Sequence, residues 1–154
     1  MPRRRPRPFT IRRSPIHGRG AFATRPIPAG TRLIEYAGAR LTLEEADARY
    51  PDIPGTPHHT FLFNVDEEFV VDAGVHGNAA RWINHSCDPN CDVVVDGGKL
   101  FVETIRDVAP GEELAYDYGL ILKTRHTPAA KKLYPCRCGA PSCRGTMLAR
   151  KRRA

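Results

Sequence analysis

The stretch Arg81-Trp82-Ile83-Asn84-His85-Ser86-Cys87-Asp88-Pro89-Asn90 gathers amide, imidazole, hydroxyl, thiol and carboxylate groups between apolar segments. Buried polar groups cost free energy unless they are hydrogen-bonded, so this density within a domain is typical of a functional site. Further along, Glu113-Leu114-Ala115-Tyr116-Asp117-Tyr118 places two tyrosines two residues apart, a spacing that puts both on the same side of a strand. These two stretches are the first candidates for the site.

The composition indicates one globular domain. The chain has 154 residues, of which 41% are hydrophobic and 27% are charged, enough apolar surface for a packed core. It contains no run of about 18 apolar residues, so we expect no membrane span. The basic start of the chain has no apolar stretch behind it, unlike a secretory signal. We therefore expect an intracellular, monomeric protein.

The net charge of +7 is concentrated at the two ends of the chain. Four arginines lie within the first seven residues and four basic residues at 150–153, which leaves 16 basic and 17 acidic residues for the body. Like-charged ends are usually solvated, but they also suit contact with an anionic partner such as nucleic acid. Composition leaves both interpretations open.

Short apolar runs between turn residues predict a mostly β fold with one small helix. Strands or hairpins are expected at residues 9–12, 33–38, 61–65 with 69–72, and 91–95 with 100–104. Thr42-Leu43-Glu44-Glu45 is typical of a capping box and predicts a helix that ends near Tyr50. Residues 78–83 suit a helical turn, and the segment 123–133 supports no firm prediction.

The glycines at the start of the chain match the pattern of dinucleotide-binding sites, in Gly18-Arg19-Gly20-Ala21-Phe22-Ala23. That pattern needs a helix directly after the glycines, and Pro26 and Pro28 prevent one. We therefore interpret the segment as a tight turn, and on its own such a turn is more often an ordinary β-turn than a ligand contact.

Three of the five cysteines, Cys136, Cys138 and Cys143, lie within eight residues of one another. An odd count without a secretory signal argues against a disulfide framework. Closely spaced thiolates are typical of a zinc site, which takes four ligands in a tetrahedron. The candidates for the fourth ligand are Cys87, Cys91 and His126. It also stays open that all five cysteines are ordinary reduced thiols.

Five motifs, in this order, resemble those of the SET domain of protein-lysine methyltransferases. They are Ser14-Pro15-Ile16-His17-Gly18-Arg19-Gly20, Tyr36-Ala37-Gly38, the 81–90 stretch, the 113–118 stretch and the cysteine cluster at 136–143. They cover about Arg12 to Met147, and the likeness is greatest to the trithorax-type branch. The resemblance implies small β-sheets around a pseudoknot, in which the C-terminal segment passes under the loop that holds Asn84 and His85.

The resemblance also implies domain boundaries and a set of zinc ligands. The SET domain would cover residues 9–122 and a zinc-binding post-SET segment residues 132–148, between basic tails at 1–8 and 149–154. In post-SET enzymes the cysteine that ends the Asn-His-Ser-Cys motif joins the three tail cysteines. The implied zinc ligands are therefore Cys87, Cys136, Cys138 and Cys143, with Cys91 left over.

By the same resemblance, the methyl donor is S-adenosylmethionine and the acceptor is a lysine ε-amine. The residues implied in donor binding are His17, Gly18, Arg19, Phe61, Asn84, His85 and Arg137. Tyr118 corresponds to the catalytic tyrosine, and Tyr36 to a wall of the lysine channel. Phe61 stands where trithorax-type enzymes usually have a tyrosine, and Trp82 where they have a phenylalanine. Tyr116 takes a position that is Tyr or Phe in the family, and its hydroxyl predicts mono- or dimethylation rather than trimethylation.

The sequence therefore predicts an S-adenosylmethionine-dependent protein-lysine N-methyltransferase acting on basic tails of histones or histone-like proteins. Such a tail would be attracted by acidic groups at Asp47, Asp52, Glu67 and Glu68. The basic ends are candidates for nucleic-acid contact, and the protein would work in the cytoplasm or at chromatin in the nucleus. The alternative is a non-catalytic SET module that binds nucleic acid or protein through its basic tails. The intact tyrosine, asparagine and histidine motifs argue against this alternative.

Overall fold

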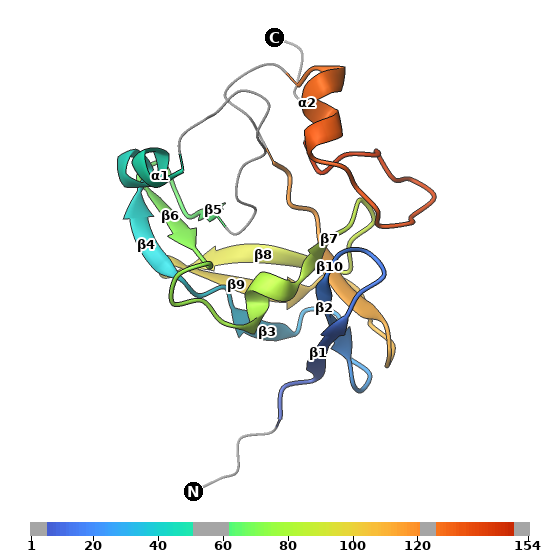
Figure 1. The fold of residues 1–154 in the computed structure, drawn as a ribbon. Helices are drawn as coiled ribbons and strands as arrows, with labels where there is room; N and C mark the ends of the chain where they lie inside the picture. Colours follow the sequence, from blue (N-terminus) through green and yellow to red (C-terminus); the bar gives the residue numbers. More distant parts are fainter. Residues whose placement is uncertain (1–5, 51–61, 121–125, 150–154) are drawn as a thin grey trace, which may run out of the picture.

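The computed structural model describes residues 6–50, 62–120 and 126–149, which form two β-sheets and a few short helices (Figure 1). The fold is mostly β, as the sequence predicts. None of the described helices is long and apolar enough to cross a membrane.

The larger sheet brings together the motifs singled out in the sequence. Its spatial order is β1 (Phe9–Arg13), β2 (Arg19–Ala23), β10 (Glu113–Tyr116), β8 (Cys91–Asp96), β9 (Lys99–Thr104) and β3 (Arg32–Glu35), with β7 (Asn84–His85) beside β10. Strand β10 runs parallel to β7, with Ala115 opposite Asn84 and Tyr116 opposite His85. The 81–90 and 113–118 stretches are therefore direct neighbours in the sheet, although Asn84 and Glu113 are 29 residues apart in the chain.

The β1–β2 hairpin forms one edge of this sheet. Its turn contains Gly18 at φ +46°, a left-handed conformation that favours glycine. Ala21 and Ala23 are buried against Phe9 in the main core. The interpretation of residues 18–23 as a turn alone is therefore wrong: the small apolar side chains after the glycines let β2 pack as a strand between β1 and β10.

The smaller sheet has the order β4 (Ala39–Thr42), β6 (Phe69–Asp72) and β5 (Leu62–Asn64), and helix α1 (Leu43–Arg49) follows β4. The Thr42 hydroxyl accepts a hydrogen bond from the Glu45 backbone N–H at 3.1 Å, so the capping-box prediction is confirmed. The Tyr50 hydroxyl donates to the fully buried Asp72 carboxylate at 2.6 Å, which ties the end of α1 to β6.

The C-terminal segment folds back onto the body of the molecule. A 3-10 helix, η1 (Ala79–Trp82), leads into β7, and helix α2 (Pro128–Leu133) opens the tail. Pro135 bridges to Thr146 and Leu120 bridges to Leu148, so the tail forms a closed loop beside β10. Its buried anchors are Tyr134 and Leu148.

The structure changes the bounds of two predicted strands and adds one helix in a region without a prediction. The strand expected at 33–38 ends at Glu35, because a Cβ at Gly38 would lie within 2.3 Å of the Asp72 carbonyl oxygen and the chain turns there into β4. The strand expected at 61–65 is β5, and Phe61 lies outside the described residues. The region without a prediction, 123–133, contains α2.

Candidate functional site

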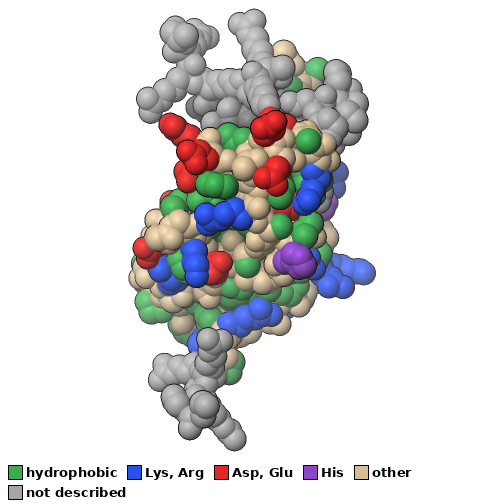
Figure 2. Space-filling view, turned by 90° about the vertical axis from the view of Figure 1, so that its left-hand side faces the viewer, with side chains coloured by type: hydrophobic (Ala, Val, Ile, Leu, Met, Phe, Trp, Pro, Cys, Tyr) green, Lys and Arg blue, Asp and Glu red, His purple; other side chains and the backbone are tan. Residues whose placement is uncertain are grey.

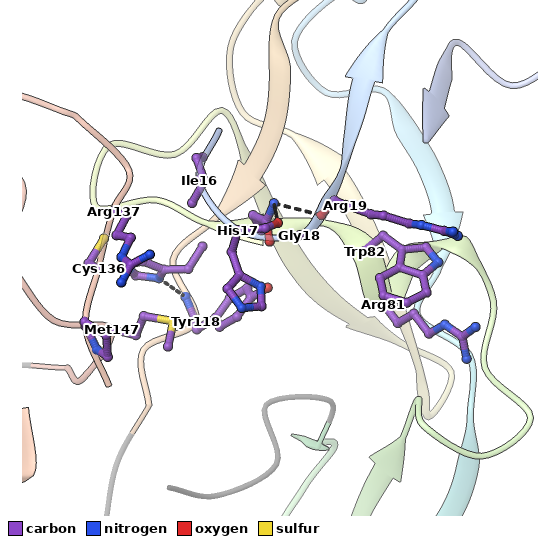
Figure 3. A pocket seen from close by; sticks show the side chains of 13 residues that line it. Ile16, His17, Gly18, Arg19, Arg81, Trp82, Tyr118, Cys136, Arg137 and Met147 are labelled. Atoms are coloured by element: carbon purple, nitrogen blue, oxygen red, sulfur yellow. Dashed lines mark hydrogen bonds between the residues drawn. The ribbon is translucent and has the colours of Figure 1, made fainter. Parts of the chain in front are cut away.

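A cavity of about 430 Å³ opens between the β1–β2 turn, the η1–β7 segment and the tail (Figure 3). The sequence-predicted residues that line it are His17, Gly18, Arg19, Asn84, His85, Tyr118, Cys136 and Arg137. A volume of this size is typical of small-molecule sites. Three segments distant in the chain therefore meet around one concave site.

The side-chain amide of Asn84 holds the β1–β2 turn against this cavity. Its Nδ2 atom lies 3.1 Å from the His17 carbonyl oxygen, 3.0 Å from the Arg19 carbonyl oxygen and 2.9 Å from Glu113 Oε2. The Ser14 hydroxyl donates to the same carboxylate at 2.8 Å. Because the amide is buried and its hydrogen bonds are made, the backbone of the turn has a fixed position at the cavity wall.

His85 connects the cavity to the cysteine cluster. Its Nδ1 accepts a hydrogen bond from the Tyr118 backbone N–H at 3.0 Å, and its Nε2 lies 3.4 Å from Cys87 Sγ. Burial lowers the pKa of His85 to about 4, with the Asp117 carboxylate opposing the shift and the Arg144 guanidinium adding to it. The ring is therefore neutral at physiological pH and carries its proton on Nε2, facing the sulfur.

Four aromatic rings, which we call the aromatic row, extend inward from the cavity: Tyr118, Tyr116, Phe63 and Tyr36. The last of them, Tyr36, packs in a second buried cluster with Val71 and Leu100. Successive ring centroids lie 4.8, 6.1 and 5.5 Å apart. Tyr118 follows the end of β10, so it does not share a strand face with Tyr116 as the sequence suggested, yet the two rings are in contact. The Tyr118 hydroxyl donates to the Ile83 carbonyl at 2.5 Å.

The hydroxyls of the aromatic row stay protonated. Burial raises the pKa of Tyr118 and of Tyr36 well above the usual value near 10, and it does the same for Tyr116. A side-chain hydrogen bond joins Tyr36 and Tyr116. At neutral pH these groups can donate and accept hydrogen bonds, but they are not bases.

The structure brings Cys87 to the three tail cysteines. The Sγ atoms of Cys87, Cys136, Cys138 and Cys143 all lie within 4.8 Å of one another, and those of Cys87 and Cys136 are 3.7 Å apart. Tetrahedral zinc with Zn–S bonds of about 2.3 Å places sulfurs about 3.8 Å apart, so the cluster has the size of a zinc site.

The other two candidates for a fourth ligand lie elsewhere. Cys91 is buried in the main core, where burial raises the pKa of its thiol to about 12. His126 places Nδ1 at 2.8 Å from the Ala149 carbonyl oxygen, at the end of the tail. Of the three, Cys87 alone joins the cluster.

A bidentate ion pair fastens the tail beside the aromatic row. Arg144, directly after the third tail cysteine, donates from Nη1 and Nη2 to the two oxygens of Asp117 at 2.8 and 3.0 Å. The Arg144 backbone N–H points at Cys87 Sγ, 3.3 Å away. Asp117 stands between Tyr116 and Tyr118, so this pair, which we call the latch, joins the cysteine cluster to the tyrosine segment.

Two guanidinium groups flank the indole of Trp82 at the cavity wall. The Cζ atoms of Arg19 and Arg81 lie 5.6 and 4.7 Å from its ring centroid, and Figure 3 shows Trp82 between them. Arg81 Nε is buried and has no hydrogen-bond partner among the described residues. Its position is therefore suited to an additional acceptor, such as a ligand carboxylate.

Sequence reasoning missed Phe63, Arg81, Asp117 and Arg144. Asp117 and Arg81 stand inside the two quoted stretches, and Arg144 adjoins Cys143, so motif proximity was an available signal for them. For Phe63 the signal was weaker, an aromatic in a short strand. Of the predicted site residues, Phe61 lies outside the described part of the chain, and Tyr36 and Tyr116 stand behind Tyr118 rather than at the cavity.

Small sheets, a parallel β7–β10 contact beside a cavity, and a cysteine-rich tail that closes over the cavity are the features that characterise this fold and its site. Residues 18–119, more than half of the sequence, match the SET domain. The chain belongs to the SET domain family.

Its relatives include much longer proteins. It is 45% identical over 138 residues to histone-lysine N-methyltransferase trithorax of Drosophila virilis, which covers 86% of this chain and 3% of that protein. It is 44% identical over 138 residues to histone-lysine N-methyltransferase 2B of Homo sapiens, covering 87% and 5%. It is 40% identical over 149 residues to the H3 lysine-4 specific enzyme of Eremothecium gossypii, covering 92% and 15%. The chain thus spans a small part of each of these relatives.

Proposed function

We propose that this chain is a protein-lysine N-methyltransferase that uses S-adenosylmethionine and acts on lysine 4 of histone H3 or on a similar basic tail. The observation that carries the proposal is the position of Tyr118, which lines the cavity and also begins the aromatic row. A donor in the cavity and a lysine among the aromatic rings would meet at this hydroxyl. The names of the relatives support the reaction and the histone substrate.

The cavity suits the donor in shape and polarity. Gly20, directly after the turn, has no room for a side chain, because a Cβ there would lie 2.3 Å from Glu113 Oε2, the same oxygen that accepts from Asn84 Nδ2. Arg19 and Arg81 offer guanidinium groups to a carboxylate, as the methionine part of the donor has. Arg137 on the tail is the residue we assign to the adenine side. His85 and Asn84 would fix the floor of the site.

The reaction requires mainly that the methyl donor and the lysine amine are aligned. When bound, the donor supplies an electrophilic methyl group on a sulfonium sulfur, and the acceptor is a neutral lysine amine. The residues of the chain would hold the two in line and exclude water. The Tyr118 hydroxyl already donates to the Ile83 carbonyl, so its oxygen is left to accept a hydrogen bond from the amine. Because this phenol stays protonated, it would position the amine but not deprotonate it. Methyl transfer would break the sulfur–carbon bond, form the nitrogen–carbon bond and leave a neutral thioether, and the resulting ammonium would lose its proton to solvent.

The methylation state is part of the proposal. Tyr116 contributes a buried hydroxyl, bonded to Tyr36, where a phenylalanine would leave space. The added hydroxyl restricts a nitrogen that already carries methyl groups, so mono- and dimethyl-lysine are the expected products. Mass spectrometry of the wild-type product checks this, and Tyr116→Phe is expected to add trimethyl-lysine. A wild-type product that is mainly trimethylated contradicts the assignment.

The four-cysteine cluster is proposed to hold one structural zinc ion that fastens the tail over the cavity. Metal analysis is expected to find about one zinc per chain. Cys138→Ser should lower both zinc content and donor affinity, whereas Cys91→Ala, outside the cluster, should retain the metal. Full activity in a metal-free preparation would count against this role of the tail.

Labelled-methyl transfer tests the activity directly. The wild-type chain is expected to label an H3 tail peptide, and replacing lysine 4 of the peptide by arginine should remove the label. Tyr118→Phe should reduce transfer strongly, while Tyr50→Phe, a hydroxyl removed outside the cavity and the aromatic row, should not. If the wild-type chain transfers no methyl group to any histone or basic protein, the proposal fails and a non-catalytic binding module is favoured. The monomeric state and the cellular location stay predictions.

A further inference from the structure

The acidic and basic residues of this chain are strongly segregated along the sequence. The first 34 residues contain nine arginines and no aspartate or glutamate; the first acidic residue is Glu35. In contrast, residues 62–72 contain four acidic residues and no basic one. The charge separation found at the chain ends therefore continues into the folded body, which net charge alone does not reveal.

The basic segment folds into the β1–β2 hairpin at the edge of the larger sheet. Arg12, Arg13 and Arg19 lie on its strands and Arg7 and Arg25 at its open end, where Arg25 Nη2 donates to the Pro6 carbonyl at 2.9 Å. All five side chains are exposed. We call this surface the basic hairpin. Figure 1 shows β1 at the side of the molecule away from α1.

Acidic side chains lie on the opposite lobe, which we call the acidic lobe. It consists of helix α1 and the β5–β6 turn, and its exposed members are Glu44, Glu45, Asp47, Asp66, Glu67 and Glu68. Figure 2 shows acidic side chains gathered over the end of the molecule that carries α1. Although Arg49 ends α1, the exposed charges of this lobe are mainly negative and those of the hairpin positive, so a basic and an acidic partner would be drawn to different faces.

The basic hairpin holds a pair of like charges face to face. Arg13 is directly opposite Arg19 in the antiparallel register, and like charges at opposed positions destabilise a sheet. Charged residues also protect edge strands from aggregation, but either sign serves that purpose, so protection does not explain an all-arginine surface. An anionic partner does explain it, because phosphates would relieve the repulsion.

Nearby carboxylates are already engaged. Glu113, on the strand next to β2, accepts hydrogen bonds from Ser14 and Asn84, and Glu112 pairs with Arg106 at 3.0 Å. Among the described residues, no carboxylate lies within ion-pair distance of any arginine of the basic hairpin. Apart from that of Arg19, which lines the cavity, their positive charge is therefore available to a partner.

Besides Arg19 on Trp82, two more of these guanidinium groups rest on aromatic rings. Arg12 Cζ lies 4.0 Å from the Phe22 ring centroid and Arg7 Cζ lies 4.9 Å from that of Phe9. Stacking fixes the guanidinium plane and leaves its N–H groups at the edges for bidentate contact with phosphate oxygens. Arg7 to Arg13 can span about 20 Å of extended chain, along which duplex DNA carries about 12 phosphate charges.

We propose that the basic hairpin is a docking surface for the phosphate backbone of duplex DNA. Arginine side chains on both faces of an edge hairpin suit a partner that is charged along its whole length. DNA on this side leaves the acidic lobe free for a basic protein tail, so that both partners can bind at once. The link to a histone tail rests on the proposed function; binding of DNA to the hairpin does not.

Fluorescence anisotropy with a labelled duplex of about 20 base pairs tests the proposal, with salt varied between about 50 and 300 mM and no donor or peptide present. The variant Arg7→Gln, Arg12→Gln, Arg13→Gln removes three charges from the hairpin. The matched control Arg32→Gln, Arg40→Gln, Lys99→Gln removes three charges from β3, β4 and β9. Methyl transfer to free H3 peptide monitors folding, since none of the six residues belongs to the proposed active site.

The hairpin variant is expected to lose at least tenfold in affinity near 0.1 M salt, and its log–log salt slope should become shallower by about 2 to 3. The control should change affinity less than threefold. Equal losses in both variants, or no binding by the wild type, would overturn the proposal. Equally tight binding of poly-glutamate would also overturn it, in favour of an acidic protein. Failure of methyl transfer with intact DNA binding would overturn only the proposed function.

Discussion

At the scale of single residues, the tyrosines of the aromatic row should make the free energy of unfolding depend on pH in the alkaline range. Burial raises the pKa of Tyr36, Tyr116 and Tyr118 in the fold above the value near 10 of an unfolded tyrosine. The unfolded state therefore loses protons first as pH rises. We predict that the free energy of unfolding falls above about pH 10, by up to about 1.4 kcal/mol per pH unit for each tyrosine.

Urea unfolding at about pH 8 and about pH 10.5 measures this dependence. Tyr118→Phe should make the loss of stability between the two pH values smaller. Val102→Ala, which leaves a cavity in the main core without a titrating group, should lower stability by a similar amount at both. An unchanged pH dependence in Tyr118→Phe would contradict the argument.

Residue types at the site could be read from the sequence where one short motif carries the chemistry. Asn84 and His85 were singled out because their polar groups are too dense for ordinary packing, and both line the cavity. Trp82 between Arg19 and Arg81 could not be foreseen, because that contact depends on where the β1–β2 turn meets η1. A contact between residues as far apart in the chain as Arg19 and Trp82 leaves no pattern in the local sequence.

At the scale of elements, the latch between Asp117 and Arg144 couples the tail to the tyrosine segment. We predict that Arg144→Gln raises the KM for the donor roughly fivefold, because a bidentate, partly buried pair is stronger than an ordinary surface pair. The zinc content should stay near that of the wild type, since the Arg144 backbone N–H still reaches Cys87 Sγ. Steady-state kinetics with varied donor measures the effect.

A charge swap separates a positioning role from a general loss of stability. Asp117→Arg and Arg144→Asp should each raise the KM for the donor. The double variant, which restores an ion pair, should have a lower donor KM than either single variant. Arg106→Gln breaks another surface pair, with Glu112, and should leave the donor KM unchanged. If the donor KM of the double variant is no lower than that of the single variants, the latch has no positioning role at the donor site.

Elements with local signals could be predicted, and those defined by partners could not. Helix α1 has its capping box, and the β8–β9 hairpin has its two glycines, so both follow from nearby residues. Strand β7 has two residues and exists because β10 lies beside it. Helix α2 has a capping threonine but no buried residue, hence no apolar period to find. The order of strands in the larger sheet came only with the structure.

At the scale of the whole molecule, the acidic lobe gives substrate capture a dependence on ionic strength. We predict that the KM for a basic H3 tail peptide rises with salt, because screening shortens the reach of the lobe to about 10 Å at 0.1 M and less above it. The KM for the donor should change less, since no residue of the acidic lobe lines the cavity. Asp52, also expected to attract the tail, lies outside the described residues.

Charge-neutralising variants identify the source of this effect. Glu67→Gln with Glu68→Gln should flatten the salt dependence of the peptide KM. Asp92→Asn with Asp96→Asn removes the same charge from β8 and should not. Identical salt profiles in all three proteins would refute a role for the lobe.

Trp82 is the single tryptophan of the chain, and it stands in the wall of the cavity between two cations. Its emission therefore reports on this one place, without label or background. A donor that draws either guanidinium toward its carboxylate changes the surroundings of the indole, so titration should shift the intensity or colour of the fluorescence. Loading of the site can thus be followed in real time, apart from any chemistry, in the unmodified protein.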